Sequence, residues 1–231
     1  AFQRDLHYDR EAMRSNTAAI GRLLTRVFIS VMLILPLLSG AAMGAERQSE
    51  RAPRVSFGAG ALVGACRITD SGDDGPGAIE SSEALGGGLI FEAMMSRHFG
   101  IHSGLWYKYT YFEYRGGGSA NMQGLSIPFM LLATADWWRM SFGLLAGFNL
   151  THYLTSSMRF FGTEIETLKY LENPQFAAAA GVQLKFAMGR FTDLFVSFIG
   201  ERGITPFTRT GDSPNHLYGA AVHSGVLFRT F

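Results

Sequence analysis

Large apolar side chains recur at every second position along most of the chain, and glycine or polar residues fill the positions between them. Side chains of a β-strand point alternately to opposite faces, so this period of two indicates strands with one apolar face. In residues 54–66, Phe57 and Val63 share one face, while Gly58 and Gly64 share the other. The same pattern predicts strands at about residues 85–95, 99–111, 125–133, 142–150, 178–186, 194–201 and 216–231.

The segments between these eight predicted strands alternate between long and short. The long connectors are 67–84, 112–123, 152–174 and 203–215, and the short ones are 96–98, 135–138 and 187–190. Alternation of this kind places all long loops at one end of an up-and-down antiparallel meander. An even number of strands also returns the end of the chain to the side on which the first strand starts.

Closure of this meander into a barrel follows from the properties of lipid. No water is present in the hydrocarbon to satisfy backbone groups, so a sheet that spans it has to close on itself. An eight-stranded barrel has an interior just wide enough for side chains, which gives the glycine-rich face a use as the inner face. We therefore predict an all-β fold, a closed eight-stranded antiparallel up-and-down transmembrane β-barrel over residues 54–231.

The N-terminal part of the chain has the pattern of a secretory signal peptide. Arg14, Arg22 and Arg26 precede an apolar stretch at residues 27–38, and small residues follow it. The stretch is shorter than the roughly 20 residues that a membrane-spanning helix needs, although an uncleaved anchor is the alternative. We predict an upstream extension at 1–12, a signal peptide at 13–45 and a short linker at 46–53 before the barrel.

Composition and charge narrow the classes of function. The 231 residues include 28 Gly, only 17% are charged, and the formal net charge is +1. With three lysines and no run of like charges, the chain lacks the basic face that nucleic acid requires, so no nucleic-acid partner is expected. A single cysteine excludes an internal disulfide framework and a Cys-rich zinc site.

The chain resembles small outer-membrane β-barrel proteins, among them the OmpA transmembrane-domain, OmpX, OmpW and PorT-like families. The resemblance rests on the signal peptide, the strand layout and the segments GIHSGLWYKYTY (100–111), LSIPFMLL (125–132), FGLLAGFNL (142–150) and ERGI (201–204). It implies a bacterial outer-membrane location in contact with outer-membrane lipid, insertion by the barrel-assembly machinery, and Phe231 as a C-terminal sorting signal. Alternation in the last strand favours an outward Val222, Val226 and Phe228, which leaves Phe231 off the pattern.

Candidate catalytic and metal motifs fail their own requirements. The glycines at 58, 60 and 64 resemble a dinucleotide loop, but the helix and acidic residue that should follow are absent. The acidic segment 70–80 lacks the ligand spacing of a calcium loop of EF-hand type. The segment at His152 resembles the outer-membrane lipid A deacylases only loosely, because Leu154 stands where their His-x-Ser motif has serine. No catalytic, cofactor or metal residue is predicted.

Four charged residues fall on the predicted inner face of the barrel. They are Glu92, Lys108, Lys185 and Glu201, and Gln183 and His102 share the same parity. Two acids balance two bases, and the narrow interior leaves little water around them. We therefore predict a buried lumen charge network that closes the barrel to ions, with Glu92 and Lys108 as one pair to test.

Surface and lumen then offer three hypotheses for function. The first is a structural or adhesion-type surface protein acting through its extracellular loops, with Met158, Phe160 and Phe161 of the 152–174 loop as contact candidates and a host molecule as partner. The alternative is an OmpW-like conduit for a small hydrophobic ligand, because apolar side chains also occupy inward positions. The second alternative is an outer-membrane lipid-modifying enzyme.

Overall fold

The computed structural model describes residues 54–68, 79–114, 116–208 and 215–230. The predicted extension, signal peptide and linker lie outside this range, and so do Phe231 and most of the acidic segment 70–80. No helix in the described part of the chain is long and apolar enough to cross a membrane. One 3-10 turn, η1 (Leu168–Tyr170), accompanies the strands.

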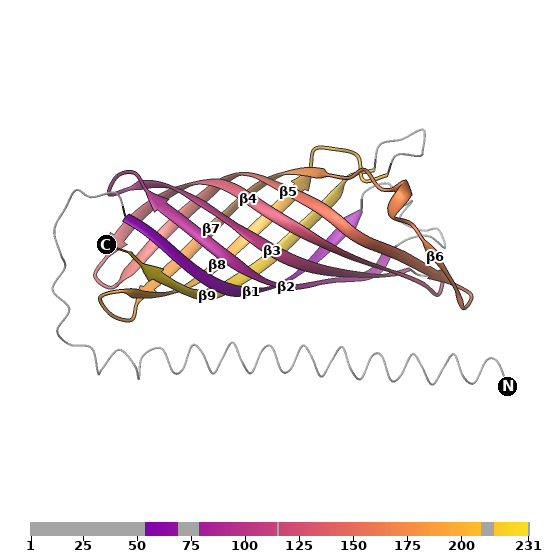
Figure 1. The fold of residues 1–231 in the computed structure, drawn as a ribbon, viewed down its shortest axis with the longest axis horizontal. Coiled ribbons are helices and arrows are strands. Elements are labelled where there is room, and N and C mark those ends of the chain that lie inside the picture. The colour runs from indigo at the N-terminus through magenta and orange to yellow at the C-terminus, as the bar shows by residue number, and fades with distance from the viewer. Residues whose placement is uncertain (1–53, 69–78, 115, 209–214, 231) are drawn as a thin grey trace. The chain divides into compact units, whose positions relative to one another are not determined.

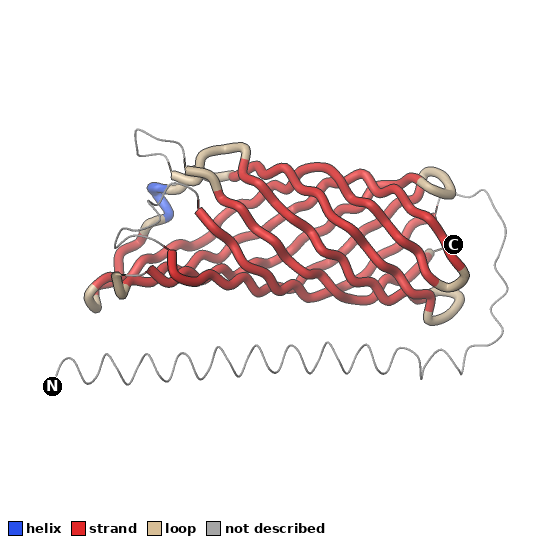
Figure 2. Tube along the Cα trace, turned by 180° about the vertical axis from the view of Figure 1, so that it is seen from behind, coloured by secondary structure: helices blue, strands red, loops and turns tan. Residues whose placement is uncertain are grey.

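Eight of the nine strands in the described residues form a closed antiparallel ring, as the sequence predicts (Figures 1 and 2). Each pairs with its neighbours along the chain, β4 pairs with β5, and β1 pairs with β9 to close the ring. The remaining strand is the short β6, which lies outside the ring and pairs with the loop-side end of β5 in the described residues. The strands are β1 (Arg54–Ile68), β2 (Ile79–Met94), β3 (Phe99–Tyr114), β4 (Gly118–Trp137), β5 (Met140–Phe160), β6 (Thr163–Glu166), β7 (Gln175–Ala187), β8 (Thr192–Gly203) and β9 (Leu217–Arg229).

Short turns join β2 to β3, β4 to β5 and β7 to β8 at one end of the barrel, which we call the turn end. The start of β1 and the end of β9 lie there too, since Ser56 pairs with Arg229. The remaining connections lie at the opposite end, called here the loop end. This arrangement confirms that the connectors predicted as long and those predicted as short lie at opposite ends of the barrel.

Two of the expected long loops are largely strand, which corrects their predicted bounds. Segment 112–123 forms the ends of β3 and β4 around a tight turn, and β5 continues to Phe160. At these strand ends the alternation is reversed: Ala120 and Met122 are buried, while Asn121 and Gln123 face outward. Polar outward side chains fit water better than lipid. The apolar outer face therefore stops before the strand does, and the predicted strands are too short at this end.

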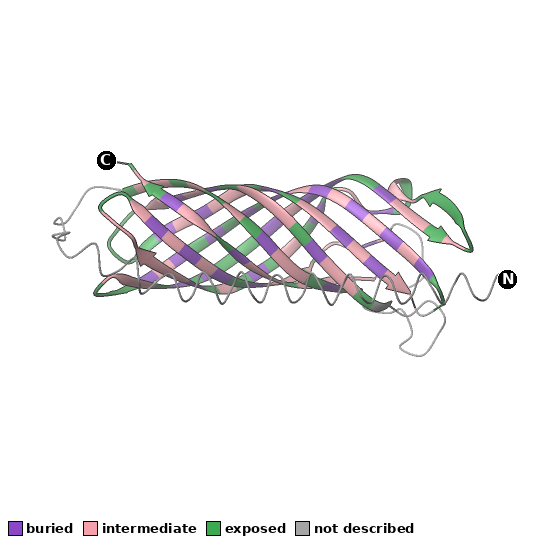
Figure 3. Ribbon diagram, turned by 90° about the horizontal axis from the view of Figure 1, so that it is seen from below, coloured by how far each residue is buried: buried purple, intermediate pink, exposed green. Residues whose placement is uncertain are grey.

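The predicted inner and outer faces are confirmed throughout the ring (Figure 3). In β9, Phe228 faces outward, while His223 and Leu227 are buried, so the preferred register of the last strand also holds. Glycine is required where strands and large inner side chains crowd together. A Cβ at Gly88 would lie 2.9 Å from the Trp106 ring, and one at Gly60 would lie 3.2 Å from it.

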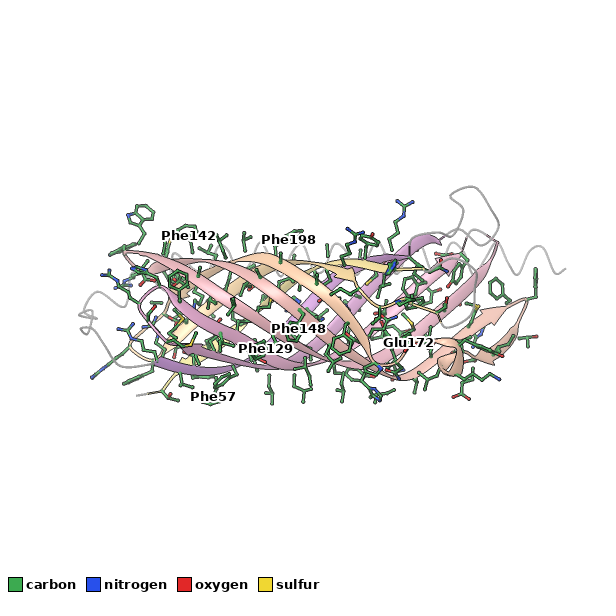
Figure 4. All side chains as sticks on the ribbon, turned by 90° about the horizontal axis from the view of Figure 1, so that it is seen from above. Phe57, Phe129, Phe142, Phe148, Glu172 and Phe198 are labelled. Atoms are coloured by element: carbon green, nitrogen blue, oxygen red, sulfur yellow. The ribbon has the colours of Figure 1, made fainter. Side chains whose placement is uncertain are left out.

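The outer face carries an apolar belt. In this belt the aromatic rings of Phe129 and Phe148 stack with their centroids 5.5 Å apart. Phe57, Phe142 and Phe198 also project outward from the barrel wall (Figure 4). Trp137 and Trp138 are exposed at the turn end, where amphipathic rings favour a membrane interface. A closed ring with an apolar exterior is the architecture of a membrane-spanning barrel of the outer-membrane type.

Candidate functional site

A first polar cluster fills the lumen toward the turn end and centres on Glu92 of β2, which is 2% exposed. Its carboxylate accepts hydrogen bonds from Lys185 Nζ at 2.8 Å and Gln183 Nε2 at 2.9 Å, both on β7 across the barrel. His102 Nδ1 on the adjacent β3 lies 3.0 Å from the same carboxylate. One buried charge therefore has three partners from two sides of the ring.

A second polar cluster lies nearer the loop end and centres on Glu201 of β8. Lys108 Nζ lies 3.4 Å from one carboxylate oxygen, and Asn149 Nδ2 donates to the other at 2.7 Å. Ser126 Oγ donates to Asn149 Oδ1 at 2.7 Å and accepts from Thr151 at 3.2 Å. Sequence analysis predicted Lys108 and Glu201 as members of the network but missed Asn149 and Ser126, whose inward parity was their only signal.

The four charged residues therefore form two pairs, and Glu92 and Lys108, the pair chosen for testing, are not partners. Glu92 stands opposite His102 in the register, and Lys108 lies six residues further along β3. At about 3.3 Å per residue this separation is roughly 20 Å, too far for an ion pair. The partners come instead from β7 and β8 across the lumen.

Apolar side chains pack between and around these clusters. Trp106 is 1% exposed, and its ring meets His223 edge-on with centroids 4.6 Å apart. One buried group consists of Leu62, Ile90, Trp106, Phe195 and Leu227, and another of Met130, Leu132, Leu145, Ala179 and Ile199. A cavity of about 10 Å³ remains between the Trp106 side chain and the second polar cluster, room for about one water molecule.

The loop end of the lumen is covered by a third apolar group. Phe112 and Tyr153 of the wall pack there with Leu171 and Phe207, which two separate loops contribute. The loops are joined by a bridge between Leu171 and Thr208, and Glu172 N donates to Phe207 O at 3.1 Å (Figure 4 labels Glu172). Packed side chains thus occupy the lumen from this cover to the turn end, where Arg229 Nε donates to Asp193 at 2.6 Å.

Histidines of the described barrel, His152 among them, are dispersed and form no common site. His102 contacts Glu92, His223 contacts Trp106, and His98 Nδ1 lies 3.1 Å from the Thr134 carbonyl near the turn end. His152 is exposed on the outer face of β5. Among the described residues no group of three or more His, Cys, Asp or Glu side chains is placed to hold a metal ion.

The three contact candidates of the 152–174 segment have different environments. Met158 packs against the buried group at the loop end, and Phe160 lies 5.8 Å, centroid to centroid, from Tyr114. Both belong to β5, so the expectation that they occupy an exposed loop is wrong. The bulge that places Thr155 opposite Gln123 and Tyr153 opposite Gly124 turns Met158 inward. Only Phe161 is fully exposed, at 93%.

Phe161 and Gly162 form the two-residue turn of the β5–β6 hairpin. Their φ angles are 49° and 81°, the left-handed values that a tight hairpin turn of this length requires. A phenylalanine rarely adopts such a backbone conformation, and a residue held in it is a candidate for function. Arg159 Nη2 lies 3.0 Å from Glu164 across the hairpin, and this hydrogen bond holds the pKa of the Glu164 carboxyl below its usual value.

Comparisons with known proteins find similar chains among solved structures. No family model matches the chain, and no curated protein matches it. Among solved structures, the chain is similar to Ail, the attachment invasion locus protein of Yersinia pestis, with 12% identity, a TM-score of 0.47, and coverage of 78% of this chain and 100% of that one.

Two further solved structures are similar to most of the chain. The outer membrane protein OprG from Pseudomonas aeruginosa shares 12% identity with a TM-score of 0.48, covering 80% of this chain and 99% of that one. The outer membrane enzyme PagL shares 16% identity with a TM-score of 0.38, covering 73% and 97%. OprG and PagL are outer-membrane proteins, the class that the sequence resemblance names.

Proposed function

We propose that this protein is an outer-membrane surface protein whose β5–β6 hairpin contacts a partner outside the cell. The observation that carries the proposal is Phe161: a large apolar side chain, 93% exposed, held in the left-handed region at the tip of a hairpin beyond the ring. Exposed aromatic side chains on rigid supports are typical centres of protein contact surfaces. The hairpin also exposes Ile165, which is 51% accessible.

The filled lumen favours this role over that of a conduit. A conduit for small hydrophobic molecules needs an open entrance at the loop end, and Leu171 and Phe207 occupy that position. Further along, the Trp106 side chain and both ion pairs lie in the path. An adhesion-type role needs only a stable barrel and an accessible hairpin, and both are present.

Adherence of bacteria to a cultured epithelial monolayer tests the proposal. Cells that express the protein should adhere, and Phe161→Ser should lower adherence by about tenfold, the effect of losing one contact centre. Phe99→Ser is the matched control, because Phe99 is 61% exposed but lies at the turn end. Both variants should reach the cell surface in equal amounts.

Equal adherence of cells with and without the protein would overturn the proposal. Purified protein in liposomes then separates the alternatives. Flux of small apolar solutes into the vesicles would assign a conduit, and release of fatty acid from added lipid A would assign a lipid-modifying enzyme.

A further inference from the structure

The outer wall of the barrel has a hollow of about 650 Å³ where four adjacent strands carry small side chains. It is lined by residues 65–67 of β1, 178–180 of β7, 200–202 of β8 and 218–220 of β9. These four strands are neighbours in the ring, and no described residue from the opposite wall lines the hollow. The hollow therefore opens toward lipid and not into the lumen.

Strand register builds the hollow from three rows of outward side chains. The small row consists of Ala180, Gly200, Ala220 and Ala65, each paired with the next across the strands. On its turn side lies a bulky row of Val182, Phe198, Val222 and Val63. On its loop side lies a basic row of Ala178, Arg202, Tyr218 and Arg67.

Gly200 is not required by the packing of the wall. A Cβ at this position would come no closer than 3.8 Å to its nearest neighbour, the Ala180 carbonyl oxygen. At the inward Gly181, by contrast, a Cβ would overlap the carbonyl oxygen of Phe198. The main consequence of glycine at 200 is the depth of the hollow, and a larger residue fits there without disturbing the strands.

A hollow in a wall that faces hydrocarbon is filled by an acyl chain. An empty space would cost the lining atoms their dispersion contacts, and the alanine side chains offer water no hydrogen bonds. Two copies of the barrel fit poorly against each other here, since two concave surfaces leave a void and would bring their arginines together. A single lipid chain meets neither difficulty.

Arg202 gives the hollow its charge at the level where lipid headgroups lie. It is ten residues from the start of β8 at Thr192, which at the usual rise and tilt is roughly 25 Å along the membrane normal, the height of an apolar belt. Its guanidinium lies over the Tyr218 ring at 5.5 Å, and Arg67 follows on the next strand. On the β2 side, Glu83 directly precedes Ala84, which pairs with Gly64 of β1, so this acid lies nearer to Arg67 than to Arg202 along the ring, and Arg202 is the better residue for a test of the charge.

We propose that this hollow binds an anionic, phosphate-bearing lipid. One acyl chain lies over the small row, on the loop side of the bulky row. Its phosphate contacts Arg202 and Arg67 of the basic row. Guanidinium groups bind phosphate oxygens through paired, charge-assisted hydrogen bonds, which gives the site its preference for an anionic headgroup.

Native mass spectrometry of the delipidated, refolded barrel tests this site, with dioleoyl phosphatidylglycerol and dioleoyl phosphatidylcholine as probes. Their chains are identical, so any preference comes from the headgroup. The phosphatidylglycerol complex should be about tenfold tighter, and Arg202→Gln should remove about fivefold of that preference, the usual effect of one arginine near an anionic headgroup. Arg54→Gln, which removes a positive charge at the turn end, should keep it.

Filling the hollow separates chain binding from headgroup binding. Gly200→Leu should weaken both lipids equally, whereas Ala59→Leu, on the outer face of β1 away from the hollow, should weaken neither. Heat-modifiable migration in gels confirms that each variant has folded. Equal binding of the two lipids to the unmodified protein, or an unchanged preference in Arg202→Gln, would overturn the proposal. A dimer that lipid does not dissociate would assign the hollow to a second copy instead.

Discussion

Glu92 is the residue on which the largest number of polar contacts in the lumen converges. It accepts from Lys185 and Gln183 and contacts His102, and its partner Lys185 lies 93 positions away in the sequence. Parity along each strand was enough to predict that these groups face inward. The partner of each group depends on the stagger between strands that are not neighbours in sequence, and no local pattern encodes that stagger.

Removing one member of the Glu92–Lys185 pair should leave the other charged and buried. We expect Glu92→Ala to lower the free energy of unfolding by about 3 to 5 kcal/mol, and an added Lys185→Met to recover most of that loss. Adding Lys108→Met in place of Lys185→Met is the control, and its effect should add to that of Glu92→Ala. Urea titrations of the barrel in lipid vesicles measure all three, and additive effects in the first double variant would contradict the pairing.

Two buried serines differ in their hydrogen bonds. Ser126 Oγ joins Asn149 to Thr151, whereas Ser197 Oγ has no protein partner among the described residues. Ser126→Ala should therefore cost about 1 to 3 kcal/mol, because the groups it leaves behind stay buried. Ser197→Ala should change stability by less than about 0.5 kcal/mol. The same titrations compare them, and equal losses would refute the assigned contacts.

At the scale of elements, the loop ends of β3, β4 and β5 show where prediction from the sequence succeeds and where it stops. Apolar alternation predicts the eight wall strands and their faces, because lipid demands apolar outward side chains. Beyond the lipid that demand ends: Asn121 and Gln123 face outward while Met122 faces inward, and the apolar pattern no longer marks the strand. The β5–β6 hairpin was missed for the same reason, since its four-residue strand is exposed throughout.

Two adjacent phenylalanines of the β5–β6 hairpin have different roles, since Phe160 anchors the hairpin and Phe161 is exposed for binding. Phe160 packs near Tyr114 and over Gly118, where a Cβ would overlap its ring, whereas Phe161 is exposed. Phe160→Ala should raise amide exchange across residues 163–166 by at least about tenfold, because the hairpin loses its main apolar contact. Phe161→Ala should leave exchange within about twofold. Equal exchange in the two variants would mean that Phe160 does not anchor the hairpin.

At the scale of the whole molecule, the lumen is a stack of alternating apolar and polar layers under a cover made by two loops. A path for ions would need several of these layers to separate at once. We therefore expect the unmodified barrel to give no steady conductance in planar bilayers. Trp106→Ala, which removes the largest side chain of the central layer, should lower stability by about 3 to 5 kcal/mol and produce intermittent current. A steady large conductance in the unmodified protein would show that the layers do not close it.

The central claim is that a filled barrel presents its β5–β6 hairpin outside the cell, and labelling of intact cells tests it most directly. The native Cys66 is buried, so a membrane-impermeant thiol reagent reports on engineered cysteines in the Cys66→Ser background. Phe161→Cys at the hairpin tip and Gly189→Cys in the β7–β8 turn lie at opposite ends of the barrel. We predict rapid labelling at position 161 and labelling at position 189 only after the outer membrane is permeabilised. Labelling of 189 but not 161 in intact cells would contradict the account.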